Sequence, residues 1–385
     1  MKYDFDRVID RNNTCSIKYD PVSRGKPKDV LPMWVADMDF ASPPCVVGAL
    51  TARAEHGIFG YSEPDVAYNA AVQKWFEERF GWSVEREWLV CTLGVVNALY
   101  VAVRAFTKPG EAVLVQQPVY YPFHAAVRDT GRELLVNELL YNNHRYSIDF
   151  ADFEAKVKKA KLFILCNPHN PVGRVWTHDE LSRMGEICLR YGVTVISDEI
   201  HQDIVFSGHR HLVFAALDER FADITVTCTT PSKTFNLAGL LHANIFISNT
   251  ALRTQFKQEY ANCGLSQPGI MGLVACQAAY TNGAEWVDAL VGYLAGNMAL
   301  VREFLQVNIP NIKLVEPEGT YLAWLDFSEL KLSDQELENV ITHKAKLWLN
   351  SGPIFGQGGS GFQRMNIACP RSVLHGALER LKVVA

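Results

Sequence analysis

The feature that most constrains the fold is an alternation of apolar runs and helix-patterned stretches that starts near residue 90. Each apolar run is short and rich in aliphatic residues, which is typical of a strand buried on both faces. The runs are Ala112–Val115, Leu134–Val136, Leu162–Cys166, Val193–Ser197, Ile224–Cys228 and Ala243–Ile247. Helical patterns lie between them, as in Thr177–Tyr191 and Leu252–Asn262. The alternation predicts an α/β fold with a mostly parallel sheet flanked by helices.

The pattern changes after Asn262–Gly264, and the remaining sequence predicts a smaller α+β domain. A long helix is expected from Ala284 to Val307. After it come a strand-like run, Thr320–Asp326, a helix, Ser333–Lys346, and a second strand-like run, Phe362–Ala368. The 385 residues suffice for two domains. The proline- and aromatic-rich N-terminal segment is expected to pack with the smaller one. We therefore predict a large domain over residues 45–283 and a small domain formed by residues 1–44 and 284–385.

Composition excludes several classes of protein. The net charge is −5 with no basic tract, so no nucleic-acid partner is expected. No apolar run approaches the roughly 20 residues of a membrane span, so no membrane partner is expected. The N-terminus is charged and lacks the apolar core of a secretory signal. Nine cysteines without a CxxC pair favour a reducing, cytoplasmic location and indicate no metal site.

Three polar residues follow three successive strands of the predicted sheet. Asn170 lies in the NPHNPVG run after Leu162–Cys166, Asp198 follows Val193–Ser197, and Lys233 follows Ile224–Cys228. Taken singly, the asparagine is a turn residue, the aspartate a helix cap and the lysine a surface charge. Ligands of open α/β sheets bind at the carboxyl ends of strands, so we expect the three to converge on one edge.

One chemistry needs these three groups together. A lysine amine forms a Schiff base with an aldehyde cofactor, a carboxylate keeps a pyridine nitrogen protonated, and an amide donates to a phenolate oxygen. This predicts pyridoxal 5'-phosphate (PLP) as cofactor. Its phosphate requires hydrogen-bond donors. The N–H groups of Val95 and Val96 at a predicted helix start offer them, as do the hydroxyls of Thr230 and Ser232. By itself, the glycine before Val95 would indicate only an ordinary helix start.

Several motifs resemble those of a known family. HNPVG, SDEIH and SKTFNLAGL resemble the fold-type I PLP enzymes of the aspartate aminotransferase superfamily. The segments LPMWVADMDF (31–40), GYSEP (60–64), PVYYPF (118–123), CNPHNPVGRVW (166–176), SDEIHQDIVF (197–206) and MNIACPR (365–371) resemble the cystathionine β-lyase and C–S lyase branch, which includes the maltose-regulon modulator. The resemblance covers residues from about 3 to 383.

The resemblance implies roles for the strand-end residues and their neighbours. Lys233 would be the Schiff-base lysine and the base that removes the Cα proton. Asp198 would pair with the pyridine nitrogen, and Asn170 would donate to the phenolate oxygen. His201 stands where aminotransferases usually carry a tyrosine. Tyr120 would stack on the cofactor ring.

Four further positions complete what the resemblance implies. Tyr121 would face the substrate, and Arg364 would bind its α-carboxylate. Tyr61 would reach the phosphate of the neighbouring subunit's cofactor, which makes the enzyme a homodimer with a shared active site. Leu241 stands where many aminotransferases place a phosphate-binding arginine. The glycine-rich run 356–361 lacks the strand–helix context of a dinucleotide fingerprint and is expected to be a flexible loop beside Arg364.

These features together predict a carbon–sulfur lyase of amino-acid metabolism. It would convert cystathionine or other cysteine S-conjugates to pyruvate, ammonia and a thiol by α,β-elimination. Lys233, Tyr120 or Tyr121 would protonate the departing thiolate. An aminotransferase of class I/II, acting on an amino acid and a keto acid, uses the same key residues and remains an alternative. A regulatory protein-binding role alongside the lyase is a second alternative.

Overall fold

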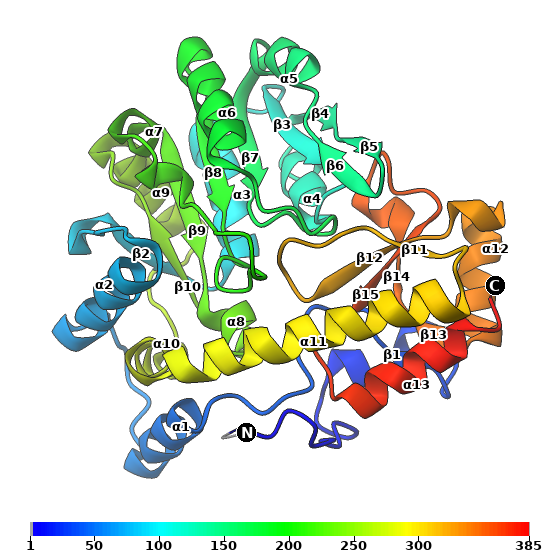
Figure 1. Ribbon diagram of the computed structural model, residues 1–385. Helices are drawn as coiled ribbons and strands as arrows, with labels where there is room; N and C mark the ends of the chain where they lie inside the picture. Colours follow the sequence, from blue (N-terminus) through cyan, green and yellow to red (C-terminus); the bar gives the residue numbers. More distant parts are fainter. Residues whose placement is uncertain (1–2, 385) are drawn as a thin grey trace.

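The computed structural model describes residues 3–384 and contains a large and a small sheet (Figure 1). The large sheet has seven strands in the order β2-β10-β9-β8-β7-β3-β4. They span Leu89–Thr92, Ala243–Phe246, Thr225–Thr229, Thr194–Asp198, Ala160–Cys166, Ala112–Gln117 and Glu133–Glu138, respectively. Strand β10 runs antiparallel to β2 and β9, and the other neighbouring pairs of this sheet are parallel. The predicted α/β class with a mostly parallel sheet is confirmed.

Helices cover both faces of this sheet. One face packs against α3 (Val95–Phe106), α4 (Pro122–Arg128) and α9 (Thr250–Asn262). The other packs against α5 (Phe150–Val157), α6 (His178–Tyr191) and α7 (Glu219–Asp223). Strand β3 is buried along its whole length because both faces are covered. Local signals set the helix limits, as in α6, where Thr177 and Glu180 form a capping box and Gly192 ends the helix.

The small sheet is antiparallel and has four strands in the order β11-β12-β15-β14. They span Lys313–Leu314, Leu322–Asp326, Phe362–Asn366 and Asn350–Ser351. Helices α11 (Ala284–Asn308) and α13 (Arg371–Leu381) pack together beside it (Figure 1). The predicted helix Ser333–Lys346 is shorter than expected, since α12 (Asp334–Asn339) passes into a π-helical turn, Val340–Lys344.

The N-terminal region joins the small sheet's side of the molecule. Strand β1 (Leu31–Pro32) pairs in parallel with β13 (Leu347–Trp348). Helices α1 (Pro44–His56), α2 (Val66–Phe80) and α10 (Ile270–Asn282) pack on one another, and a β5–β6 hairpin (Leu140–Asn142, Arg145–Ser147) lies at the surface. The large sheet lies within residues 45–283 and the small sheet within 284–385. One apolar cluster crosses that limit, so the domain limits stay a prediction.

No helix among residues 3–384 is long and apolar enough to cross a membrane. The same residues hold no group of three or more His, Cys, Asp or Glu side chains that could bind a metal ion.

Candidate active site

The candidate site lies at the carboxyl ends of β7, β8 and β9. These strands are parallel neighbours, and the register aligns Cys166 with Asp198 and Asp198 with Cys228. Asn170 follows the end of β7, Asp198 ends β8, and the one-turn helix α8 (Pro231–Thr234) follows β9. Because parallel strands end at one edge of the sheet, the structure brings the three predicted polar groups to the same place.

The Lys233 side chain extends from α8, which Thr230 caps through a bond from Ser232 N–H (3.0 Å). Its Nζ donates to the Ala36 carbonyl at 2.8 Å. Burial lowers the pKa of Lys233 from 10.5 to about 8, while Asp37 raises it and Arg364 lowers it further. An amine with this pKa is partly neutral near pH 7, so it can act as a nucleophile or a base.

The Asp198 carboxylate is buried and forms no salt bridge with any of the described residues 3–384. It is 2% exposed and accepts a bond from the Ile200 N–H at 3.3 Å. Burial raises the pKa of Asp198 from 3.8 to about 7, although Ile200 and Lys233 lower it. Such a group is stabilised by a cationic ligand, and a protonated pyridine nitrogen supplies one.

His201 and Asn170 also have polar atoms left open at the site. Neither ring nitrogen of the buried His201 has a hydrogen-bond partner within residues 3–384, and burial lowers its pKa well below the usual range. Its ring meets the edge of Tyr321 at 5.7 Å between centroids. Asn170 uses its Oδ1 to accept from Arg364 at 2.9 Å, which leaves its amide NH2 to donate elsewhere.

Arg364 lies in the middle of β15, and its guanidinium is 2% exposed. It donates to Asn170 Oδ1, to the Trp34 carbonyl at 2.9 Å and to Asn350 Oδ1 at 2.5 Å, but its Nε has no partner among the described residues. Burial lowers the pKa of Arg364 from 12.5 to about 10, so it stays charged at pH 7. The equally buried Arg174, in contrast, pairs with Glu180 and Glu318. A buried cation that lacks a carboxylate indicates an anionic ligand.

Two tyrosines form the side of the site near β3. Tyr120 N–H donates to the Asn170 carbonyl at 3.0 Å, and burial raises the pKa of the Tyr120 phenol. Tyr121 is 41% exposed, with its ring 5.2 Å from that of Tyr120. The glycine-rich loop 356–361 packs closely against the nearby Gln117: its Gln357 N–H donates to Gln117 Oε1 at 2.8 Å. A Cβ at Gly356 would lie 2.3 Å from Gln117 Cδ, so this loop requires glycine for close packing.

The predicted phosphate donors lie on two neighbouring turns. Val95 and Val96 begin α3 after Gly94, whose φ of 112° favours glycine. Thr92, just before this turn, pairs with Ala243, and Thr229, just before Thr230, pairs with Asn244, so both turns flank the start of β10. The Thr230 and Ser232 hydroxyls lie 2.7 Å apart.

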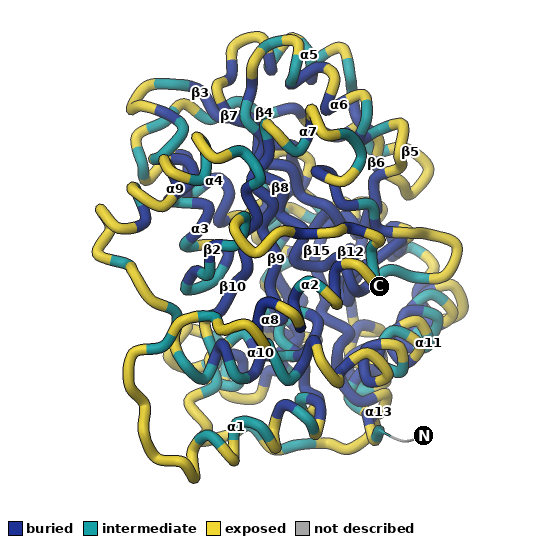
Figure 2. Tube along the Cα trace, turned by 90° about the vertical axis from the view of Figure 1, so that its left-hand side faces the viewer, coloured by how far each residue is buried: buried dark blue, intermediate teal, exposed yellow. Residues whose placement is uncertain are grey.

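Tyr61 is the one predicted residue that the structure does not bring to the site of its own chain. It is 96% exposed and lies on the exposed segment that joins α1 to α2 (Figure 2). Leu241, 59% exposed, has no charge to offer a phosphate.

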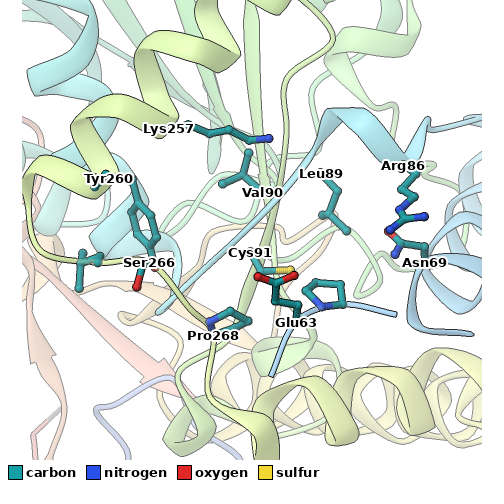
Figure 3. Close-up of a pocket in the computed structure, with 13 residues that line it drawn as sticks. Glu63, Asn69, Arg86, Leu89, Val90, Cys91, Lys257, Tyr260, Ser266 and Pro268 are labelled. Atoms are coloured by element: carbon teal, nitrogen blue, oxygen red, sulfur yellow. The ribbon is translucent and has the colours of Figure 1, made fainter. Parts of the chain in front are cut away.

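Two cavities of the structure differ in whether predicted site residues line them. A cavity of about 720 Å3 is lined by Lys233, by Asn236 and by the N-terminal segments around Arg11 and Ala36–Phe40. Another, of about 490 Å3, lies between β2 and α9, where Arg86 and Lys257 line opposite sides of it (Figure 3). None of the predicted site residues lines this second cavity, so it is not part of the candidate site.

The sequence analysis missed four groups that contact the site residues. The Trp34 carbonyl and the Asn350 side chain accept hydrogen bonds from Arg364. The Ala36 carbonyl accepts one from Lys233, and the Tyr321 ring contacts His201. Trp34 and Ala36 belong to the motif LPMWVADMDF, which could have drawn attention to them. Asn350 and Tyr321 carried no signal, since only the fold brings them there.

The fold, with its strand-end lysine, is that of the fold-type I PLP enzymes. Residues 28–381 match the model of aminotransferase class I and II, and the chain belongs to that family. It is 45% identical to the cystathionine beta-lyase PatB of Bacillus subtilis over 381 residues, covering 98% of both chains. It is 34% identical to the protein MalY of Escherichia coli, covering 97% of this chain and 96% of MalY. Cystalysin from Treponema denticola, solved with pyridoxal 5'-phosphate, superposes with a TM-score of 0.96 at 40% identity, over 99% and 98% of the two chains.

Proposed function

We propose that the chain is a PLP-dependent carbon–sulfur β-lyase that acts on cystathionine or other cysteine S-conjugates. The products are pyruvate, ammonia and a thiol. The observation that carries the proposal is the Lys233 amine, whose charge interacts with a buried carboxylate, Asp198, and a buried guanidinium, Arg364, neither of which forms a salt bridge within residues 3–384. The full-length similarity to a cystathionine beta-lyase supports this choice of reaction.

The open polar atoms of the site fit PLP. Asp198 would meet the ring nitrogen, the Asn170 amide and His201 would lie at the ring, and Tyr120 would stack on it. The phosphate would be held by the N–H groups of Val95 and Val96 and by the hydroxyls of Thr230 and Ser232. When bound, this cofactor supplies an electron sink that makes the Cα–H bond of an amino acid acidic.

The chain's own residues then divide the remaining work. Arg364 binds the substrate α-carboxylate, for which its free Nε–H and its charge are available. The Lys233 amine takes the Cα proton, since its pKa of about 8 leaves it partly neutral. The Cβ–S bond breaks as this proton leaves, and Lys233, Tyr120 or Tyr121 returns a proton to the departing thiolate. Water then releases ammonia and pyruvate.

A product assay tests the reaction. Purified protein loaded with PLP is given L-cystathionine without a keto acid, and pyruvate and thiol are followed together. Sustained, equimolar release of both supports the lyase. A single cofactor spectral change that restarts only with a keto acid would instead show transamination. Lys233→Ala should abolish turnover, whereas Lys74→Ala, at an exposed lysine paired with Glu78, should not.

We further propose that the active protein is a homodimer. The segment before α2 and the first residue of α2 expose a group of large apolar side chains: Ile58 (65%), Phe59 (58%), Tyr61 (96%) and Val66 (75%). Such a group on one segment favours a protein contact. A second copy of the chain would cover it and receive Tyr61 at its cofactor phosphate. All nine cysteines are free, which suits the proposed cytoplasmic location.

A further inference from the structure

A partly buried N-terminal segment, Trp34–Phe40, contacts both of the functional cations of the site. The Ala36 carbonyl accepts from Lys233 Nζ at 2.8 Å, and Tyr321 Oη donates to the same oxygen at 3.0 Å. Two residues earlier, the Trp34 carbonyl accepts from Arg364 at 2.9 Å. One short piece of backbone therefore sets where the amine and the guanidinium stand relative to each other.

Two asparagine side chains hold this segment by its backbone. Asn236 donates Nδ2 to the Met38 and Phe40 carbonyls, both at 2.9 Å, and its Oδ1 accepts from the Met38 N–H at 3.0 Å. Asn366 binds the carbonyls on either side of Ala36: its Nδ2 donates to the Val35 carbonyl at 2.7 Å and to the Asp37 carbonyl at 2.5 Å. The carbonyl that receives Lys233 is thus held from both directions along the chain.

Asn236 is linked to Lys233 by its place in the chain. It follows Lys233 by three residues and comes just after Phe235, the C-cap of α8. Its φ is +60°, a left-handed conformation that asparagine adopts more readily than most other residues and glycine most readily of all. This backbone directs the Asn236 amide at the segment that receives the lysine amine.

We propose that Asn236 is a positioning residue for Lys233: it holds the Ala36 carbonyl as the docking acceptor of the free amine. The inference rests on the proposed function in taking Lys233 as the reacting amine. It goes further by assigning a role to Asn236 and to the segment Trp34–Phe40. The docked amine is kept at the site whenever it is not covalently bound, ready to take or return a proton.

The charges that face the amine determine the direction of the expected effect. They are Asp37 on the segment itself, Asp198 on β8 and Arg364 on β15, with the neutral His201 and Tyr321 beside them. Asp37 is itself paired with Arg11 at 2.7 Å. A carbonyl that accepts from an ammonium favours the charged form. Loss of this acceptor therefore lowers the pKa of Lys233 below its value of about 8.

The test uses the full-length chain stripped of cofactor. The rate of covalent attachment of added PLP is followed by absorbance across pH, and borohydride trapping with mass spectrometry locates it at Lys233. Asn236→Gly keeps the left-handed backbone and removes the amide. Asn143→Gly, at an exposed left-handed asparagine between β5 and β6, is the matched control. Asn366→Ala removes the two hydrogen bonds that hold the Val35 and Asp37 carbonyls. It replaces Asn236→Gly as the test variant if Asn236→Gly does not fold.

We expect the pH midpoint of attachment to fall by about half a unit or more in Asn236→Gly and Asn366→Ala, and not in Asn143→Gly. In the loaded enzyme, kcat should fall about ten-fold or more with KM changed far less, because a displaced base costs rate more than binding. A lower thermal midpoint with an unchanged pH midpoint would mean a merely structural role and would overturn the proposal. If the wild type releases no pyruvate, the lyase proposal fails. The pH midpoints of cofactor attachment still decide whether Asn236 positions Lys233.

Discussion

Replacing Asp198 by asparagine should stabilise the cofactor-free chain at pH 8. The Asp198 carboxylate is buried, and burial raises its pKa from 3.8 to about 7. Between these two values the folded chain binds a proton that the unfolded chain does not. Stability therefore falls as the pH rises through this window, and the loss is complete above about pH 7. Asparagine has no charge to bury, so it avoids this loss.

The size of the effect follows from the shift. A rise of about three pKa units, at about 1.4 kcal/mol per unit, corresponds to about 4 kcal/mol of unfolding free energy at pH 8. At pH 5 the same reasoning gives only about 1 to 2 kcal/mol, since most of the window lies above that pH. Added PLP should reverse the order, because a protonated ring nitrogen stabilises the wild-type carboxylate and not the amide.

Urea unfolding of stripped wild type and Asp198→Asn, followed by tryptophan fluorescence at pH 5 and pH 8, measures the difference. Glu199→Gln is the control, because this neighbouring buried carboxylate already accepts from Ser197 at 2.7 Å, His211 at 2.8 Å and the Phe214 N–H at 3.1 Å. That variant should be less stable than wild type by about 1.5 to 3 kcal/mol. A gain for Asp198→Asn that is absent at pH 8, or equal at both pH values, would refute the reasoning.

Three other predictions concern the proposed activity. First, kcat for L-cystathionine should rise with pH through about 8, the pKa of Lys233, because only its neutral amine takes a proton; a flat profile from about pH 6 to 9 would place the base elsewhere. Second, Arg364→Lys should raise KM about ten-fold or more with a smaller change in kcat, because a point charge replaces a fork; Arg302→Lys, at a partly exposed arginine paired with Glu316, should change neither. Third, inactive Lys233→Ala and impaired Tyr61→Ala proteins should regain activity when unfolded and refolded together, since the mixed dimer contains one site with both native residues. No gain on mixing would contradict a shared site.

The sequence predicted the core of the candidate site because its signals are local. Each apolar run marked a strand buried on both faces, and the polar residue after each run marked its carboxyl end. Parallel neighbours end at one edge, so Asn170, Asp198 and Lys233 were expected together, and the structure brings them together. The limits of the helix after Ser333 were less well predicted, because a π-helical turn depends on packing rather than on periodicity.

Contacts between segments far apart in the chain could not be predicted from such local signals. The bonds from Arg364 to Asn350 and to the Trp34 carbonyl join residues 14 and 330 positions apart. The docking of Lys233 and Tyr321 on the Ala36 carbonyl likewise depends on how the N-terminal segment packs against residues far along the chain.

By itself, therefore, the sequence determined the fold class, the edge of the sheet that bears the site and the residue types gathered there. Hydrophobic periodicity and strand-end chemistry are written into consecutive residues, and these properties follow from them. Only the tertiary structure decided which of those polar groups lack partners. Among residues 3–384, Asp198 forms no salt bridge and the Nε of Arg364 has no hydrogen-bond partner, whereas Glu199 and Arg174 are paired. Burial and pairing depend on segments far apart in the chain, and these two properties set the pKa values on which the proposed chemistry rests.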